Sequence, residues 1–517
     1  MENQSFNAVR MESSKFGKRG VLCTALMFFL TFAFTCVLGK FGPPVFESHD
    51  GTSKLRINRA STNTMSTWVG NLVNLVPENQ LLWVTCNFER PDSINASYAF
   101  DYTQEMYVTV LGSHEETSDF LAIKKFDETL DNGADLVVAK QLASRKVDFK
   151  ANEMYSRDIT IFNLHTMPYK NFKVKVEFKN AGDIDKYGHA NHEDHQMNVM
   201  FTMRYVNRDY TSFEFSWKYT FCVVTLLVMF FPSLNRGGLL SRSKTFTSLS
   251  LIFEGFTVRL WSTKWKMWSY QQKWIMVLLV QLFFFNDPLI YFEVYNTKIG
   301  GEVLGGIYIG FMATFICTLM LFWLCALDET RDEKNLGRRD KGGCNKHAFK
   351  TAFMVFFWIY LVTTYAHIRM QEKDDPTYEA AQEGDRFVFA TALGGLLTVI
   401  YTLWFLFYTF KGLYVLCTLP PPFLFVFAIT FFTFSATVVG IFIAALYPVP
   451  SAALDFLGMY SLYNLYIWTM AFVYAPLKNS SNDTEENYGV MEFGGELRGP
   501  SMIGDIASQE EIDDMQL

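Results

Sequence analysis

The sequence has little of what most catalytic and nucleic-acid-binding proteins need. Its 517 residues hold 45 Lys and Arg against 52 Asp and Glu, so no basic excess indicates a nucleic-acid partner. Eight cysteines are too few for a disulfide-rich scaffold, and no C-x-x-C pair indicates a zinc or redox site. A nucleophile elbow, an HExxH pair, a P-loop and a dinucleotide fingerprint are all missing. The sequence therefore predicts a protein that is not an enzyme and needs no metal or cofactor.

Apolar residues are abundant instead, and they gather in eight blocks. A bilayer core of about 30 Å requires roughly 20 apolar residues in a helix, because lipid offers the backbone no hydrogen-bond partner. The sequence predicts a multipass α-helical membrane protein in which the second block is the shortest. The predicted spans cover residues 21–38, 219–234, 274–291, 304–327, 351–368, 387–410, 423–446 and 456–474.

The basic residues between the blocks indicate an orientation. If residue 1 lies inside, the short inner segments hold nineteen Lys and Arg and the short outer loops hold four. Both termini are then cytosolic. The predicted domains are a cytosolic N-terminus (1–20), a first helix (21–38), a luminal or extracellular β-sandwich (39–218), a seven-helix transmembrane domain (219–474) and an acidic disordered cytosolic tail (475–517).

The first block has two interpretations. A cleaved signal peptide would leave seven helices and place the new N-terminus outside. A run of 18 apolar residues is longer than the roughly 7–15 of most signal peptides, which favours a retained signal-anchor helix.

The outer region alternates apolar and polar residues, as half-buried strands do. Phe172, Val174, Val176 and Phe178 alternate with charged residues in the clearest example. Several such segments predict a compact β-sandwich. Cys86 lies on one of the apolar faces, which predicts a small core side chain and not a reactive thiol.

Asn95 begins the one N-x-S/T sequon on the predicted outer side. We expect a glycan there. Sequons at Asn3, Asn479 and Asn482 lie on the predicted inner side and should stay unmodified.

Three of the eight histidines, His189, His192 and His195, fall within seven outer residues. Such spacing is compatible with a metal site or with sensing of acidic secretory compartments, because the pKa of histidine is near 6.5. The alternative is a solvated polar loop. The spacing is a weak metal signature, so no metal is assigned.

Ionisable residues are nearly absent from the predicted spans, and the exception is Asn286-Asp287-Pro288 in the third. Proline removes a backbone donor there, so we expect the helix to kink or end. Asp287 either orients a ligand headgroup or has a structural role, pairing locally to satisfy the broken turn.

The inner segments suggest contacts with the membrane and with trafficking proteins. Residues 239–273 mix basic and aromatic side chains, which suits binding to anionic lipids, although positive-inside bias alone gives the same pattern. In the acidic tail, Tyr488 and Met491 fit a Y-x-x-Φ sorting motif for an adaptor, a match that is also common by chance.

Several motifs together resemble the transmembrane protein 181 family, relatives of the Wnt-secretion protein Wntless. The matching residues cover the membrane half well, whereas the outer region resembles the family weakly. They are Gly42-Pro43-Pro44, Gln272-Lys273-Trp274, Asn286-Asp287-Pro288, residues 321–325, Asp375-Pro376-Thr377-Tyr378, Tyr460, Asn464, Tyr466 and residues 471–476.

The resemblance implies a GOLD-like outer sandwich on a seven-helix bundle, with one extra N-terminal helix. It also implies a protein that binds protein or lipidated cargo for secretory-pathway trafficking. An orphan cell-surface receptor that binds a soluble extracellular ligand is the alternative. A channel is disfavoured by the few polar positions along the spans.

Overall fold

The computed structural model describes residues 18–49, 54–58, 66–90, 97, 99–113, 136–164, 169–179, 196–234, 270–295, 301–332, 345–375, 378, 385–416, 421–446 and 453–474. The chain divides into two compact units, residues 1–477 and 478–517, and all described residues belong to the first.

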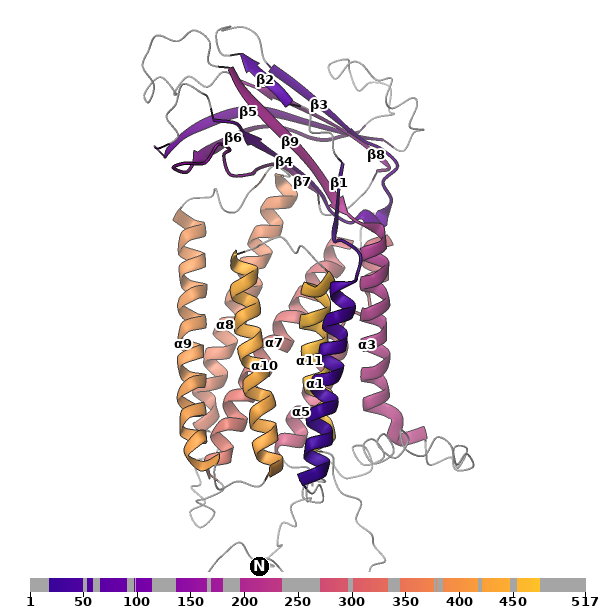
Figure 1. Ribbon diagram of the computed structural model, residues 1–517, viewed down its shortest axis with the longest axis vertical. Coiled ribbons are helices and arrows are strands. Elements are labelled where there is room, and N and C mark those ends of the chain that lie inside the picture. Colours follow the sequence, from indigo (N-terminus) through magenta and orange to yellow (C-terminus); the bar gives the residue numbers. More distant parts are fainter. Residues whose placement is uncertain are drawn as a thin grey trace, which may run out of the picture. The chain divides into compact units, whose positions relative to one another are not determined.

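The outer region forms two antiparallel sheets (Figure 1). One has the order β1-β9-β4-β7, with β2 also paired to β9, and the other has the order β3-β8-β5-β6. The strands are β1 (Phe46–His49), β2 (Lys54–Asn58), β3 (Ser66–Leu72), β4 (Leu82–Phe88), β5 (Phe100–Ser113), β6 (Leu136–Phe149), β7 (Ile159–Leu164), β8 (Asn171–Phe178) and β9 (Gln196–Val206).

The two sheets share one hydrophobic core. The predicted alternation in β8 is confirmed, because Phe172, Val174, Val176 and Phe178 are all buried in it. The ring of Trp68 on β3 stacks on Phe201 of β9 with centroids 4.0 Å apart, joining the two sheets. Cys86 is buried in the same core, as predicted. The prediction of a β-sandwich is therefore confirmed.

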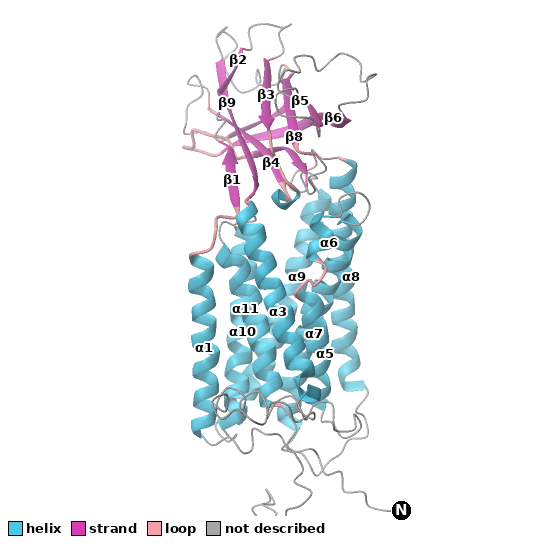
Figure 2. Ribbon diagram, turned by 90° about the vertical axis from the view of Figure 1, so that its right-hand side faces the viewer, coloured by secondary structure: helices cyan, strands magenta, loops and turns pink. Residues whose placement is uncertain are grey.

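The apolar blocks form long helices, and the third block forms two (Figure 2). The helices are α1 (Lys18–Lys40), α3 (Arg208–Leu234), α5 (Tyr270–Phe285), α6 (Ile290–Tyr295), α7 (Gly301–Asp332), α8 (Asn345–Asp374), α9 (Asp385–Leu416), α10 (Pro421–Leu446) and α11 (Ala453–Val473).

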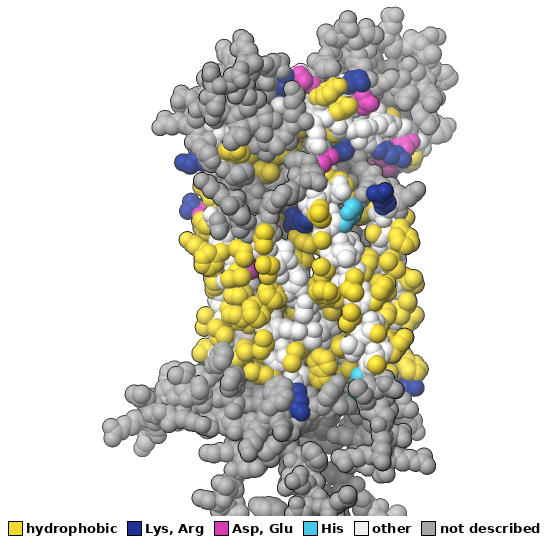
Figure 3. Space-filling view, turned by 180° about the vertical axis from the view of Figure 1, so that it is seen from behind, with side chains coloured by type: hydrophobic (Ala, Val, Ile, Leu, Met, Phe, Trp, Pro, Cys, Tyr) yellow, Lys and Arg dark blue, Asp and Glu magenta, His cyan; other side chains and the backbone are white. Residues whose placement is uncertain are grey.

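Six helical segments in the described ranges are long and apolar enough to cross a membrane. α3 and α11 are not among these six segments. Hydrophobic side chains cover the helical part of the face seen in Figure 3, whereas charged side chains lie mainly over the strands and near the helix ends. This distribution is that of a helical protein embedded in lipid. The six segments are Gly20–Lys40, Gln271–Tyr295, Val303–Asp328, His347–Glu372, Arg386–Leu413 and Leu424–Ile441.

Two glycines bring α1 against α11. A Cβ atom on Gly39 would lie 2.8 Å from Cα of Leu454, and one on Gly42 would lie 2.6 Å from Cβ of Ala453. Both separations are too short for a real side chain, so the close approach depends on glycine.

The last strand runs directly into the helices. β9 ends at Val206, and the Asn207 side chain then accepts a hydrogen bond from the backbone N–H of Asp209 at the start of α3 (2.8 Å). Val206 and Tyr210 form a small core with Val45 at the end of the α1–β1 connection. The sandwich and the helices are thus joined by packed side chains as well as by the chain itself.

Candidate functional site

The third predicted span is interrupted at Asn286, Asp287 and Pro288. α5 ends at Phe285, and α6 begins at Ile290 after a short loop (Figure 2). Pro288 has no N–H to donate, and Asp287 has a φ of 55°, in the left-handed region that Asp and Asn tolerate better than most residues. The predicted end of the helix is confirmed.

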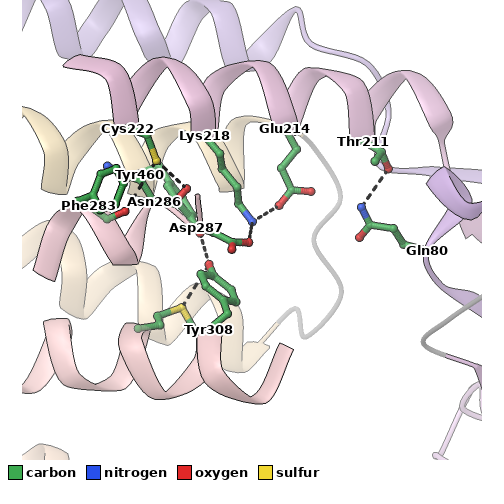
Figure 4. A network of polar contacts seen from close by, with 11 residues as sticks. Gln80, Thr211, Glu214, Lys218, Cys222, Phe283, Asn286, Asp287, Tyr308 and Tyr460 are labelled. Atoms are coloured by element: carbon green, nitrogen blue, oxygen red, sulfur yellow. Dashed lines mark hydrogen bonds and ion pairs between the residues drawn. The ribbon is translucent and has the colours of Figure 1, made fainter. Parts of the chain in front are cut away.

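Asp287 forms an ion pair with α3. Its Oδ2 lies 3.2 Å from Nζ of Lys218, and the same Nζ lies 2.9 Å from Oε1 of Glu214, one turn earlier on α3 (Figure 4). Only 5% of the Lys218 side chain and 3% of the Asp287 side chain are exposed. The Asp287 backbone carbonyl accepts a hydrogen bond from the Ile290 N–H at 3.4 Å. The ionic partner of Asp287 therefore lies on another helix, and its contact within the broken turn is made by the backbone.

Two tyrosines complete the surroundings of the Lys218 ammonium. Nζ lies 4.8 Å from the ring centroid of Tyr308 on α7 and 5.8 Å from that of Tyr460 on α11. The two tyrosine hydroxyls hydrogen-bond to each other. Aromatic faces attract an ammonium more strongly where water is excluded. We call Glu214, Lys218, Asp287, Tyr308 and Tyr460 the outer charge cluster.

An asparagine pair lies beside this cluster. Asn286 and Asn464 donate to each other through their side-chain amides, with both N···O distances 2.8 Å. The Thr225 hydroxyl on α3 donates to the Asn464 amide oxygen at 3.5 Å and accepts from the Trp468 indole at 3.2 Å. Both asparagines are fully buried, so the pair satisfies polar groups that lipid would leave without partners.

A second buried lysine lies near the other end of α7. Lys350 on α8 donates to the Asp328 carboxylate at 2.6 Å and to the Leu324 carbonyl at 3.3 Å. Its ammonium lies 4.7 Å from the ring centroid of Tyr408 on α9. Lys350 therefore ties α7, α8 and α9 together, as Lys218 ties α3, α5, α7 and α11.

The outer charge cluster favours binding and positioning over reaction chemistry. Its two carboxylates and two aromatic rings would hold a cationic group, and the Lys218 ammonium fills that place. Within the described ranges, no group of three or more His, Cys, Asp or Glu side chains is arranged to hold a metal ion. Removing one member of a buried ion pair typically costs about 3–5 kcal/mol, so the cluster has a large effect on how these helices pack.

The chain matches the family defined by a Wntless-like transmembrane domain over residues 207–478. This stretch is more than half of the chain and contains every residue of the outer charge cluster. The chain belongs to the Wntless-like family. It is also 24% identical to human Transmembrane protein 181 over 492 residues, which cover 90% of this chain and 88% of that protein. The resemblance inferred from the sequence motifs is confirmed.

α3 begins earlier in the chain than the second predicted span. That span was expected to start at Tyr219, with Lys218 in the outer domain. The Wntless-like domain instead begins at residue 207, and α3 begins at Arg208. Glu214 and Lys218 therefore lie on the same helix as the predicted span 219–234, one to two turns before it.

The other predicted site residues are not brought into this site. Asn95, the three histidines His189, His192 and His195, and the tail residues Tyr488 and Met491 lie outside the described residues. Their roles stay predictions. The predicted site around Asn286, Asp287 and Pro288 does acquire partners from other helices. Asp287 pairs with Lys218, which lies against Tyr308 and Tyr460, and Asn286 bonds to Asn464.

Sequence reasoning missed these partners for a physical reason. The spans that contain Tyr308, Tyr460 and Asn464 have the sequence pattern of ordinary apolar segments. These residues come close to Asp287 only when the helices pack together. One usable signal was the spacing of Glu214 and Lys218, because an acidic and a basic residue four apart lie on one helix face.

Proposed function

We propose that this Wntless-like protein is a non-enzymatic carrier that binds protein or lipidated cargo and supports its trafficking through the secretory pathway. The junction between the outer sandwich and the helices carries the proposal, because Val206 and Tyr210 join the two parts in one small core. Such a junction suits a protein whose outer domain captures a partner while its helices stay in the membrane. Similarity to human Transmembrane protein 181 and the Wntless-like domain adds support.

The proposed architecture has a GOLD-like outer sandwich, a seven-helix domain and a first helix that is a retained signal anchor. The contact between α1 and α11 supports retention, because cleavage would remove α1 and with it the close packing against α11 that Gly39 allows. An epitope tag at residue 1 tests this part. It should stay on the mature protein if α1 is an anchor, and it should be lost if α1 is a signal peptide.

The proposed orientation puts both termini in the cytosol, in Golgi or plasma membrane, with the sandwich on the opposite side. The excess of basic residues in the inner segments supports it. The tail could then present Tyr488 and Met491 to a sorting adaptor, and the basic segments could contact membrane lipids.

Proximity labelling tests the cargo hypothesis. A labelling enzyme inserted between β5 and β6 should mark secreted or lipidated proteins, and the same enzyme fused after residue 517 is the matched control for cytosolic neighbours. Deleting the chain should trap those proteins inside the cell, and re-expression should release them. Unchanged secretion, with no protein marked above the control, would contradict the proposal. A ligand-dependent cytosolic response without cargo retention would support the receptor alternative instead.

A further inference from the structure

Glu78 connects the sandwich to two different helices. It lies in the short 3-10 helix η2 (Pro77–Asn79), between β3 and β4. Its backbone carbonyl accepts a hydrogen bond from the Thr211 hydroxyl of α3 at 2.7 Å, and its carboxylate accepts one from the Tyr295 hydroxyl of α6 at 2.8 Å. One sandwich residue thus contacts α3 and also α6, the helix that follows the break after α5.

α6 is a six-residue helix held at both of its ends. Before its first residue, Asp287 pairs with Lys218, and at its last residue, Tyr295 donates to Glu78. Between these ends it rests against α7, where the Glu293 carboxylate occupies space that a side chain at Gly305 would fill.

One face of α3 makes the contacts near both ends of α6. Thr211, Glu214 and Lys218 are spaced by three and four residues, so they lie along one side of the helix. Figure 4 shows Thr211 at one end of this row and Lys218 reaching Asp287 at the other. Glu78, α3, Asp287 and α6 therefore form a closed ring of polar contacts.

We propose that α6 is a movable link between the sandwich and the transmembrane helices, held in place by Tyr295 and Glu78. Releasing that hydrogen bond frees the far end of α6, and motion of α6 about the break at Pro288 then displaces the end of α5 around Asn286. A change at η2, such as one caused by a partner on the sandwich, would then loosen the bundle at the break. The proposal stands on these contacts and does not depend on what the sandwich binds.

A native thiol beneath the break reports on this motion. The Cys222 thiol on α3 donates to the carbonyl oxygens of Phe283 (3.8 Å) and Asn286 (3.7 Å), at the end of α5. Cys222 is 4% exposed, so a maleimide reaches it only when the break opens. Cys317 on α7 is similarly buried, at 5% exposure, in the hydrophobic core of the helices, which makes it an internal reference in the same molecule.

The test measures labelling of the full chain in lipid nanodiscs by N-ethylmaleimide, read at each cysteine by mass spectrometry. Tyr295→Phe removes the hydroxyl that reaches Glu78 and should speed labelling of Cys222 by about three- to tenfold, as expected for one lost hydrogen bond. Cys317 should keep its rate. Glu78→Gln, which weakens the acceptor, should act in the same direction.

Tyr291→Phe is the matched control. Tyr291 lies one turn earlier on α6 and is half exposed, and no hydrogen bond of its hydroxyl is found among the described residues. Its substitution makes the same chemical change and keeps the ring that packs against Tyr295 (centroids 4.5 Å apart), so Cys222 labelling should match that of the unaltered chain. An unchanged Cys222 rate in Tyr295→Phe and Glu78→Gln would overturn the proposal. So would an equal rise at Cys317, because that pattern reports general loosening.

Discussion

Lys218 on α3 and Asp287 at the end of α5 form a buried ion pair across 69 residues of sequence. α3 is the helix that continues from the sandwich, and Asp287 lies in the break of the third span. A charge taken from water into a membrane protein is costly unless it is paired, so each of these residues requires the other. The pair therefore fixes the packing of α3 at the point where the membrane domain begins.

The amide pair of Asn286 and Asn464 should contribute measurably to stability. Hydrogen bonds between membrane helices have average coupling energies of about 0.6 kcal/mol and reach about 1.7 kcal/mol. A double-mutant cycle with Asn286→Ala and Asn464→Ala should give a coupling in that range, measured by unfolding in mixed micelles. Thr363→Ala is the control, because within the described ranges the hydrogen bonds of this exposed hydroxyl go to carbonyls of its own helix. A coupling near zero would mean that the two amides do not depend on each other.

Two adjacent glycines on α9 should respond differently to alanine. A Cβ on Gly394 would lie 2.4 Å from the Tyr360 hydroxyl, which donates to the Ala390 carbonyl at 2.7 Å. Gly394→Ala should displace that hydroxyl and cost about 1 kcal/mol, the value of one hydrogen bond. Gly395 has open space around its Cβ position, so Gly395→Ala should be neutral or stabilise the helix by up to about 1 kcal/mol. Equal effects at both positions, in thermal unfolding, would refute the close contact between α8 and α9.

The proposed orientation predicts one glycan. Asn95→Gln should abolish the mobility shift that a glycosidase produces, whereas Asn479→Gln and Asn482→Gln should leave it unchanged. The physical reason is that glycosylation occurs only on the luminal side, which is where the proposed orientation puts the sandwich. A shift that survives Asn95→Gln and disappears with Asn482→Gln would mean that the chain is inserted the other way round.

Local patterns predicted much of the fold. The alternation in β8 predicted a strand because one face of a sandwich sheet is buried, and Phe172 to Phe178 show that burial. The apolar blocks predicted helices because lipid offers the backbone no hydrogen-bond partners, so its N–H and C=O groups must bond to each other. Pro288 predicted the break after α5 because proline lacks the donor that a continuing helix needs.

Partners far apart in sequence were not predicted. The polar atoms that meet Asp287 come from α3, α7 and α11, and nothing in a single segment says which helix will face it. Lys218 was assigned to the outer domain because a charged residue beside an apolar block usually marks the end of a span. Its burial between two carboxylates and two tyrosine rings depends on tertiary packing alone.

A double-mutant cycle on the ion pair tests the central claim, that Lys218 and Asp287 hold α3 to the break after α5. Lys218→Met should lower the free energy of unfolding in mixed micelles by about 3–5 kcal/mol, because two carboxylates lose their cation. Adding Asp287→Asn to Lys218→Met should recover at least about 1 kcal/mol, since one uncompensated charge is removed. The expected result is this recovery of stability. If the losses of unfolding free energy in the two single variants simply add in the double variant, the claim is contradicted.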